Sequence, residues 1–78
     1  MNMELEKLKA IIAEVAGVHT EEITLSTTFI DDLGVDSLDV YQIIMGIEQE
    51  FNIEISAEQA EMVKTIEDAV NLIKDVIG

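Results

Sequence analysis

The stretch DSLDVYQIIMGIEQEF, residues 36–51, decides the fold because it reads as a helix with two apolar faces. At 100° per residue, the longer apolar stripe consists of Val40, Ile43, Ile44, Ile47 and Phe51. Leu38, Tyr41 and Met45 lie nearly opposite that stripe. The longer stripe predicts the core face. The shorter stripe would be buried if the helix were central, but the charges that border it favour an exposed binding face.

A helix is also predicted between Asn2, which can cap it, and Gly17, which can end it. Its apolar residues recur every three or four positions and are Leu5, Leu8, Ile11, Ile12 and Val15. The helical period is lost from His19 to Gly34. We expect a long ordered loop there, with a short turn of helix. The apolar side chains expected to hold this loop are Ile23, Leu25, Phe29, Ile30 and Leu33.

Two capping patterns predict the last two helices. Ser56 followed by Gln59 is a capping-box pattern that opens a short helix to about Val63. Thr65 with Asp68 repeats the pattern before a final helix. The apolar stripe of that helix is Ile66, Ala69, Val70, Ile73 and Ile77.

The segments together predict an all-α fold, a small four-helix bundle of three longer helices and one short helix. A long loop connects the first two helices, and the length of 78 residues suits a single domain over residues 1–78. The chain has no cysteine, which excludes disulfides and thiolate metal sites. Its 49% hydrophobic content is mostly aliphatic, which favours packed helices over a disordered tail.

The charge is strongly negative: seventeen acidic residues stand against four lysines, for a formal net charge of −13. Such a polyanion repels phosphate backbones and anionic lipid surfaces, so nucleic-acid binding and membrane insertion are not expected. Its partners should carry basic patches. The chain has no apolar run long enough to span a bilayer and no signal-peptide pattern, so we expect a soluble, cytoplasmic monomer.

The residue types that catalysis needs are scarce, and we expect no catalytic residues and no metal site. The single histidine, His19, has no nucleophile near it in the sequence and is expected to be a solvated loop residue. The acidic residues around Gly34 do not match a calcium loop, because Val40 stands where the EF-hand pattern requires glutamate. Weak, rapid binding of divalent cations by the acidic surface is still expected.

Ser37 opens the helix of residues 36–51 and can be interpreted in two ways. It can be an ordinary N-cap, and Asp36 with Asp39 also fits a capping pattern. Alternatively it carries or binds an anionic group, most naturally a phosphate, because free backbone amides and the helix dipole favour anions there. The neighbouring Asp36 is too weak a base to activate the hydroxyl, so another enzyme would have to make any covalent modification.

The stretch FIDDLGVDSLD, residues 29–39, closely resembles the attachment-site motif of acyl carrier proteins. The tripeptide Asp-Ser-Leu alone is weak evidence for this family, because it occurs by chance in many proteins. The longer stretch, followed at a fixed distance by EQEF at residues 48–51, is a specific match. The resemblance continues through residues 54–55 and 60–61 and covers essentially the whole chain.

This resemblance implies that Ser37 carries a 4′-phosphopantetheine arm, transferred from coenzyme A by a magnesium-dependent phosphopantetheinyl transferase. The arm would hold acyl chains as thioesters while fatty-acid synthase enzymes and acyltransferases act on them, so the chain itself would be a non-catalytic carrier in fatty acid biosynthesis. The matching partner-binding positions are Asp36, Leu38, Asp39, Tyr41, Met45 and Glu48. The matching acyl-pocket positions are Phe29, Val40, Ile44, Ile47, Ile55, Ala60, Val63 and Ala69.

The chain departs from the usual pattern of this family at three positions. Gln42 replaces a common glutamate, Tyr41 is larger than the usual aliphatic residue, and Ser56 replaces a frequent proline. These departures bear on the choice of partner and not on the carrier role. The alternatives are a carrier for a polyketide, D-alanyl or lipid A pathway and, in another class, an acidic helical adaptor or divalent-ion buffer.

Overall fold

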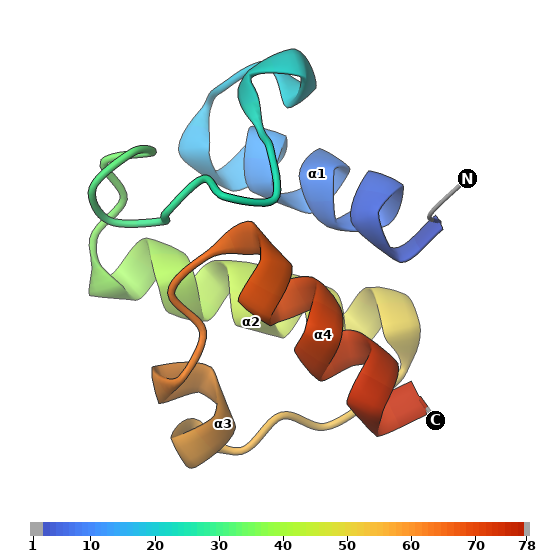
Figure 1. Ribbon diagram of the computed structural model, residues 1–78. Coiled ribbons are helices and arrows are strands. Elements are labelled where there is room, and N and C mark those ends of the chain that lie inside the picture. Colours follow the sequence, from blue (N-terminus) through green and yellow to red (C-terminus); the bar gives the residue numbers. More distant parts are fainter. Residues whose placement is uncertain (1–2, 78) are drawn as a thin grey trace.

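The computed structural model describes residues 3–77, which form four α-helices and one 3₁₀-helix (Figure 1). The α-helices are α1 (Met3–Ala16), α2 (Ser37–Phe51), α3 (Ala57–Glu61) and α4 (Ile66–Ile77), and the 3₁₀-helix η1 spans Thr20–Glu22. The predicted all-α bundle with three longer helices and one short helix is confirmed. The candidate cap Asn2 lies outside the described residues. Gly17 follows α1 with a φ of 73°, a left-handed conformation that suits glycine.

The core is aliphatic apart from Phe29 and lies where α1 contacts α2 and α4 (Figure 1). Ile43, Ile44 and Ile47 of α2 are buried in it, as the longer stripe predicted. The close approach of α1 to α2 depends on Gly46, because a Cβ atom there would stand 2.9 Å from Cγ2 of Ile11. Sequence spacing alone did not indicate this contact.

Lys7 of α1 joins the C-terminal end of α2. Its Nζ lies 3.6 Å from Oε1 of Glu50 and 5.7 Å from the centre of the Phe51 ring. The last turn of α2 contains no basic residue. A positive charge is favourable near a helix C-terminus, and Lys7 of α1 supplies that charge to α2.

The loop between α1 and α2 is ordered, and η1 is the short helical turn that was expected there. Ile23 and Phe29 are buried and Leu33 is partly buried, as predicted. The prediction was wrong for Leu25 and Ile30, which are 41% and 61% exposed. The loop has no periodic pattern, so the sequence did not reveal which of its apolar side chains point inward.

Backbone hydrogen bonds join this loop to the segment before α4. The amide of Phe29 donates to the carbonyl of Lys64 at 3.1 Å, and the amide of Ile66 donates to the carbonyl of Thr27 at 3.0 Å. Thr28 and Thr65 pair as an isolated antiparallel bridge between them. Two segments far apart in the sequence are thereby held side by side.

The starts of α3 and α4 use the predicted capping residues. The Ser56 hydroxyl accepts a hydrogen bond from the Gln59 amide at 3.1 Å, and the Gln59 side chain accepts one from the Ser56 amide at 3.0 Å. The helix opened by this box ends at Glu61, two residues before the expected Val63. Its five residues make α3 a single short turn against the longer helices.

Candidate functional site

The turn before α2 fixes the position of Ser37 through local contacts. The amide of Thr28 donates to Oδ2 of Asp32 at 2.8 Å, and the amide of Asp32 donates back to the Thr28 hydroxyl at 3.0 Å. Gly34 adopts a φ of 69°, which an L side chain rarely tolerates. Val35 is then buried, so the chain is anchored two residues before Ser37.

Asp36, not Ser37, is the N-cap of α2. Its Oδ1 accepts a hydrogen bond from the amide of Asp39 at 3.0 Å, and its carbonyl accepts one from the amide of Val40 at 3.1 Å. Ser37 is exposed, and within residues 3–77 its hydroxyl and its amide have no hydrogen-bond partner. The capping interpretation of Ser37 is therefore wrong, and its hydroxyl is available to carry a group.

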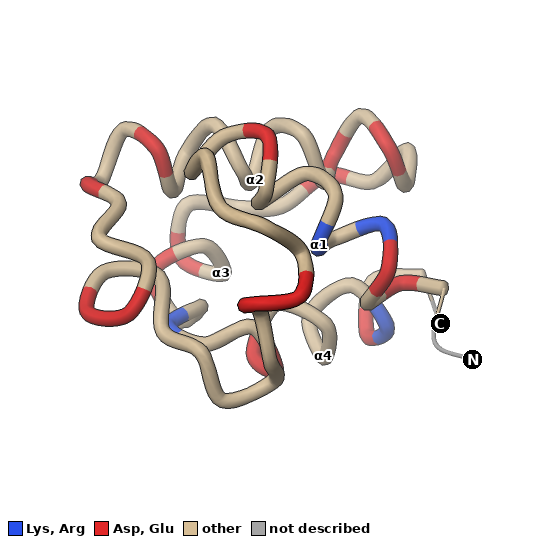
Figure 2. Tube along the Cα trace, turned by 90° about the horizontal axis from the view of Figure 1, so that it is seen from above, with Lys and Arg blue, Asp and Glu red and all other residues tan. Residues whose placement is uncertain are grey.

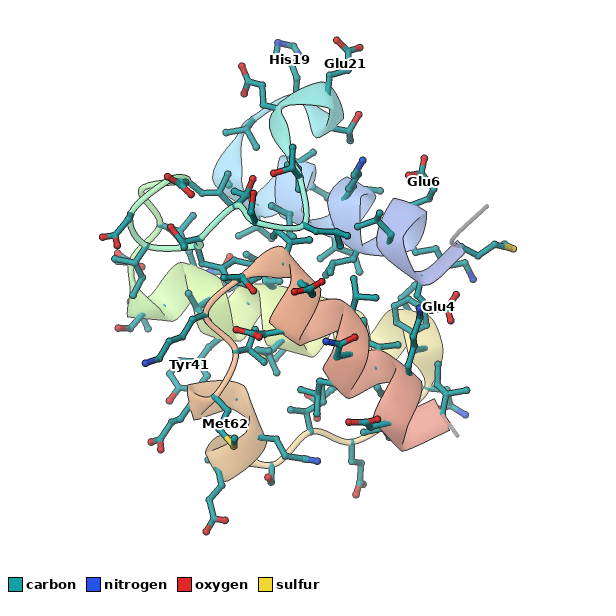
Figure 3. All side chains as sticks on the ribbon, viewed as in Figure 1. Glu4, Glu6, His19, Glu21, Tyr41 and Met62 are labelled. Carbon is teal, nitrogen blue, oxygen red and sulfur yellow. The ribbon has the colours of Figure 1, made fainter. Side chains whose placement is uncertain are left out.

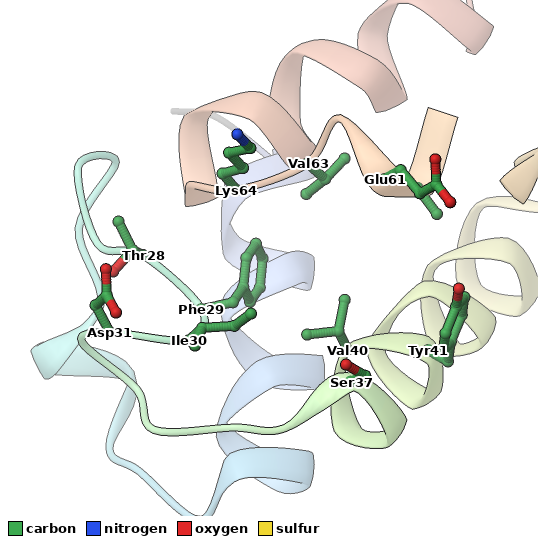
Figure 4. Close-up of a pocket in the computed structure, with 11 residues that line it drawn as sticks. Thr28, Phe29, Ile30, Asp31, Ser37, Val40, Tyr41, Glu61, Val63 and Lys64 are labelled. Carbon is green, nitrogen blue, oxygen red and sulfur yellow. The ribbon is translucent and has the colours of Figure 1, made fainter. Parts of the chain in front are cut away.

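Ser37 lines a groove of about 510 Å³ between α2, the loop before it and the segment that joins α3 to α4 (Figure 4). The apolar lining residues are Phe29, Ile30, Val40, Ala60 and Val63. Polar side chains, including those of Asp31, Glu61 and Lys64, also line it. Tyr41 lines the groove on the α2 side, below Glu61 in the close-up view. The site thus combines an exposed hydroxyl with a neighbouring apolar recess.

The structure brings four of the eight expected acyl-pocket residues into this groove, namely Phe29, Val40, Ala60 and Val63. Ile44, Ile47 and Ala69 are buried in the core, and Ile55 packs partly buried against it, but none of these four lines the groove. The acyl role of all eight stays a prediction.

Six lining residues were not expected there: Thr28, Ile30, Asp31, Tyr41, Glu61 and Lys64. The only sequence signal was for Tyr41, which is four residues after Ser37 and so on the same side of a helix.

The second apolar face of α2 is exposed. Leu38 is 72% exposed, Met45 55% and Tyr41 48%. We call these three residues the outer stripe. Its exposure excludes the alternative in which α2 is buried on all sides, and the two-faced helix is confirmed.

Acidic residues occur near both ends of α2, the helix that bears the outer stripe, and α2 contains no lysine or arginine (Figure 2). No lysine or arginine occurs between residues 10 and 63, and the first turn of α2 contains Asp39 next to its cap Asp36. Glu48 is partly buried, and its Oε2 accepts a hydrogen bond from the Ile55 amide at 2.9 Å. Its carboxylate therefore holds the connection between α2 and α3.

His19 lies far from this site. It is exposed beside η1 and points away from the body of the molecule near Glu21 (Figure 3). The expectation of a solvated loop histidine is confirmed. Within residues 3–77, no group of three or more histidine, aspartate or glutamate side chains could hold a metal ion.

Comparison with known proteins identifies the family. A family profile described as "Phosphopantetheine attachment site" matches residues 6–73. The chain belongs to the acyl carrier protein family. It is 50% identical to an acyl carrier protein of Clostridium acetobutylicum over 72 residues, which cover 92% of this chain and 94% of that protein.

A solved structure assigned as an acyl carrier protein, from Mycobacterium tuberculosis, has the same fold. It matches with a TM-score of 0.87 and 33% identity over 92% of this chain and 96% of that one. No helix in the described part of the chain is long and apolar enough to cross a membrane.

The site suits the cofactor of this family, 4′-phosphopantetheine. The group joins its protein through a phosphate, and the start of α2 offers an exposed hydroxyl beside the amides of Ser37 and Leu38, which have no hydrogen-bond partner in the described part of the chain. The groove next to Ser37 offers an apolar surface on which a chain attached to the arm could be covered. When bound, the cofactor supplies the thiol to which acyl chains are attached.

Proposed function

We propose that Ser37 carries the phosphopantetheine arm and that the chain serves as a non-catalytic carrier in fatty acid biosynthesis. The observation that supports Ser37 is its free, exposed hydroxyl, which the cap Asp36 leaves unused. The domain proposed for this role is the whole chain, residues 1–78, and it would act in the cytoplasm.

The intact mass of the protein tests the attachment site. We expect apo protein incubated with coenzyme A, magnesium and a phosphopantetheinyl transferase to gain one phosphopantetheine, and the Ser37→Ala variant to gain none. Ser26→Ala is the matched control, because Ser26 is also exposed but lies in the loop, away from the groove. A gain of mass in the Ser37→Ala variant, or none in the confirmed apo parent, would contradict the proposal.

The growing acyl chain is proposed to lie in the groove beside Ser37. Support comes from the apolar floor, where Phe29, Ala60 and Val63 are almost completely buried while the groove above them stays open. The four predicted pocket residues that pack in the core would take part only if the groove deepened. An aliphatic core with one short helix at its edge can adjust in this way more easily than a rigid aromatic one.

The outer stripe and the acids beside it are proposed to bind partner enzymes, which include the transferase and the synthase enzymes and acyltransferases. An exposed apolar strip with acidic neighbours is complementary to an apolar patch with a basic rim. The proposed contacts are Asp36, Leu38, Asp39, Tyr41, Met45 and Glu48, with the Glu48 carboxylate available only if it leaves Ile55.

The steady-state kinetics of the transferase test this surface. We expect Leu38→Ala to lower kcat/KM by about tenfold, the size typical of one important interface contact. Leu25→Ala is the matched control, since Leu25 is an exposed leucine of the α1–α2 loop, outside the outer stripe. Equal losses in the two variants would argue against a docking role for the outer stripe.

The pathway can be tested in the source cells. Chains of many lengths on Ser37, differing by two carbons, would support fatty acid synthesis. A single specialised group, such as D-alanyl, a hydroxyacyl chain or a polyketide, would support the alternative carrier role. An unmodified protein in those cells would favour the acidic adaptor or divalent-ion buffer.

A further inference from the structure

Tyr41 is the one residue that belongs to both the groove and the outer stripe. It lines the groove together with Ser37, yet 48% of its surface is exposed. Ser37 and Tyr41 are separated by four positions on α2, so their side chains lie on the same side of the helix. In the close-up view Ser37 and Val40 lie between Ile30 on one side and Tyr41 on the other (Figure 4). A chain that enters the groove from Ser37 therefore does so between these two exposed apolar side chains.

The two flanking residues differ in what they can cover. Ile30 is 61% exposed and comes from the loop, whose backbone is tied to the segment before α4 through Phe29 and Lys64. Tyr41 extends from a regular helix toward α3, where Glu61 lines the same groove. Its side chain is half-exposed and lines the groove, and a tyrosine at the edge of an apolar recess can cover apolar groups with its ring while its hydroxyl contacts water.

We propose that Tyr41 sets which acyl chains the groove retains, by covering the part of the chain that lies between Ser37 and the groove floor. This inference rests on the proposed attachment at Ser37. A chain long enough to reach under the ring gains apolar contact with it, and an acetyl group does not. The ring then raises the retention of medium-length chains over short ones.

Tyrosine fluorescence tests this directly, because Tyr41 is the only tyrosine and the chain has no tryptophan. Protein loaded with an octanoyl or an acetyl group at Ser37, each verified by intact mass, is titrated with acrylamide. We expect octanoyl loading to lower the quenching constant by roughly 1.5- to 2-fold, since the chain removes one face of the ring from contact with water. We expect acetyl loading to leave the constant unchanged.

Thioester cleavage by hydroxylamine provides a second, independent measurement. Hydroxylamine attacks the thioester carbonyl, releases the arm's thiol and forms the hydroxamate, so a covered chain reacts slowly. We expect Tyr41→Ala to raise the octanoyl rate about fivefold relative to the acetyl rate of the same variant, as loss of some tens of Å² of apolar contact implies. Tyr41→Phe should keep the parental ratio. Gln42→Ala is the matched control, since Gln42 is exposed on α2 and does not line the groove.

Normalising to the acetyl rate removes any general effect of the substitution on fold or on reagent access. Unchanged octanoyl-to-acetyl ratios in Tyr41→Ala, or equal quenching of the two loaded parents, would overturn the role of Tyr41 while leaving attachment at Ser37 intact. Failure of the parent to take up either group at Ser37 would overturn both proposals together.

Discussion

Thr65 and Asp68 are joined by two reciprocal hydrogen bonds at the start of α4. The Thr65 amide donates to Oδ2 of Asp68 and the Asp68 amide donates to the Thr65 hydroxyl, each at 3.1 Å. Oδ2 of Asp68 also accepts the amide of Lys64 at 3.1 Å. The backbone hydrogen bonds from Lys64 and Thr65 hold the pKa of Asp68 below its ordinary value of 3.8. The Asp68 carboxylate therefore holds the backbone of Lys64 and Thr65, the segment that pairs with the α1–α2 loop.

The lowered pKa of Asp68 predicts a pH-dependent contribution to stability. A depressed carboxyl pKa stabilises the folded state above the unfolded-state pKa, near 4, and this stabilisation is lost as the pH falls through the folded-state pKa. We expect Asp68→Asn, which keeps an acceptor oxygen but loses the negative charge near the start of α4, to cost about 0.5 kcal/mol of unfolding free energy near neutral pH. The difference between parent and variant, measured by urea unfolding, should shrink below about pH 4.

Asp75 supplies the control for this measurement, because it is an exposed carboxylate of the same helix and has none of these hydrogen bonds. Asp75→Asn should leave stability unchanged or raise it slightly, since it lowers the net negative charge. A parent–variant difference for Asp68→Asn that stays constant across the acid range would show that the charged carboxylate contributes nothing to folding.

Glu48 is expected to stabilise the α2–α3 connection as well as to border the outer stripe. Glu48→Ala removes the acceptor of the Ile55 amide, and the hydrogen exchange of that amide should accelerate about fivefold or more, the effect of losing roughly 1 kcal/mol of protection. Glu48→Gln keeps an acceptor oxygen and should restore most of the protection. If the Ile55 amide exchanges equally fast in all three proteins, the hydrogen bond is not made in solution.

The parts of this fold that the sequence predicted are those with local causes. The start of α2 follows from Asp36, and that of α3 from Ser56 with Gln59, because each cap contacts its own helix within three residues. The two apolar faces of α2 follow from the spacing of its apolar residues. These features also revealed Ser37, since the attachment motif is a continuous stretch of chain.

The groove could not be predicted in the same way, because it combines the stretch around Ser37 with residues 60–64, which are distant in the sequence. Residues 28 and 64 of its lining are brought together by the pairing of Thr28 with Thr65, which no local sequence pattern predicts. The irregular loop has no period to show that Phe29 points inward while the adjacent Ile30 remains exposed. The family resemblance supplied four residues of the groove and placed Tyr41 among the partner-binding positions only.

Gly46 is predicted to be intolerant of alanine despite the higher helix propensity of alanine. The added Cβ would approach Cγ2 of Ile11 to 2.9 Å, and a methyl group attached to a branched Cβ has little freedom to move away. We expect Gly46→Ala to lower the unfolding free energy by about 1–2 kcal/mol, the usual cost of overpacking. Chemical denaturation of the purified variant measures this value.

A double-mutant cycle with Ile11→Ala isolates the proposed contact. Without Cγ2 the alanine at position 46 has space, so the two substitutions together should cost less than the sum of their separate costs. Additive costs would mean that the loss arises elsewhere than at the contact between α1 and α2.

The net charge of −13 predicts that stability rises with ionic strength, because salt screens the repulsion among carboxylates on a small domain. We expect Tm to rise by roughly 5 °C or more from low salt to about 0.5 M sodium chloride, since about 1 kcal/mol shifts Tm by several degrees in a domain of this size. Millimolar magnesium should have a similar effect.

The control is a Glu21→Gln and Glu22→Gln double variant, which removes two charges from exposed positions on η1. Its Tm should be higher at low salt and rise less steeply, whereas a parental Tm that does not change with salt would contradict the repulsion argument.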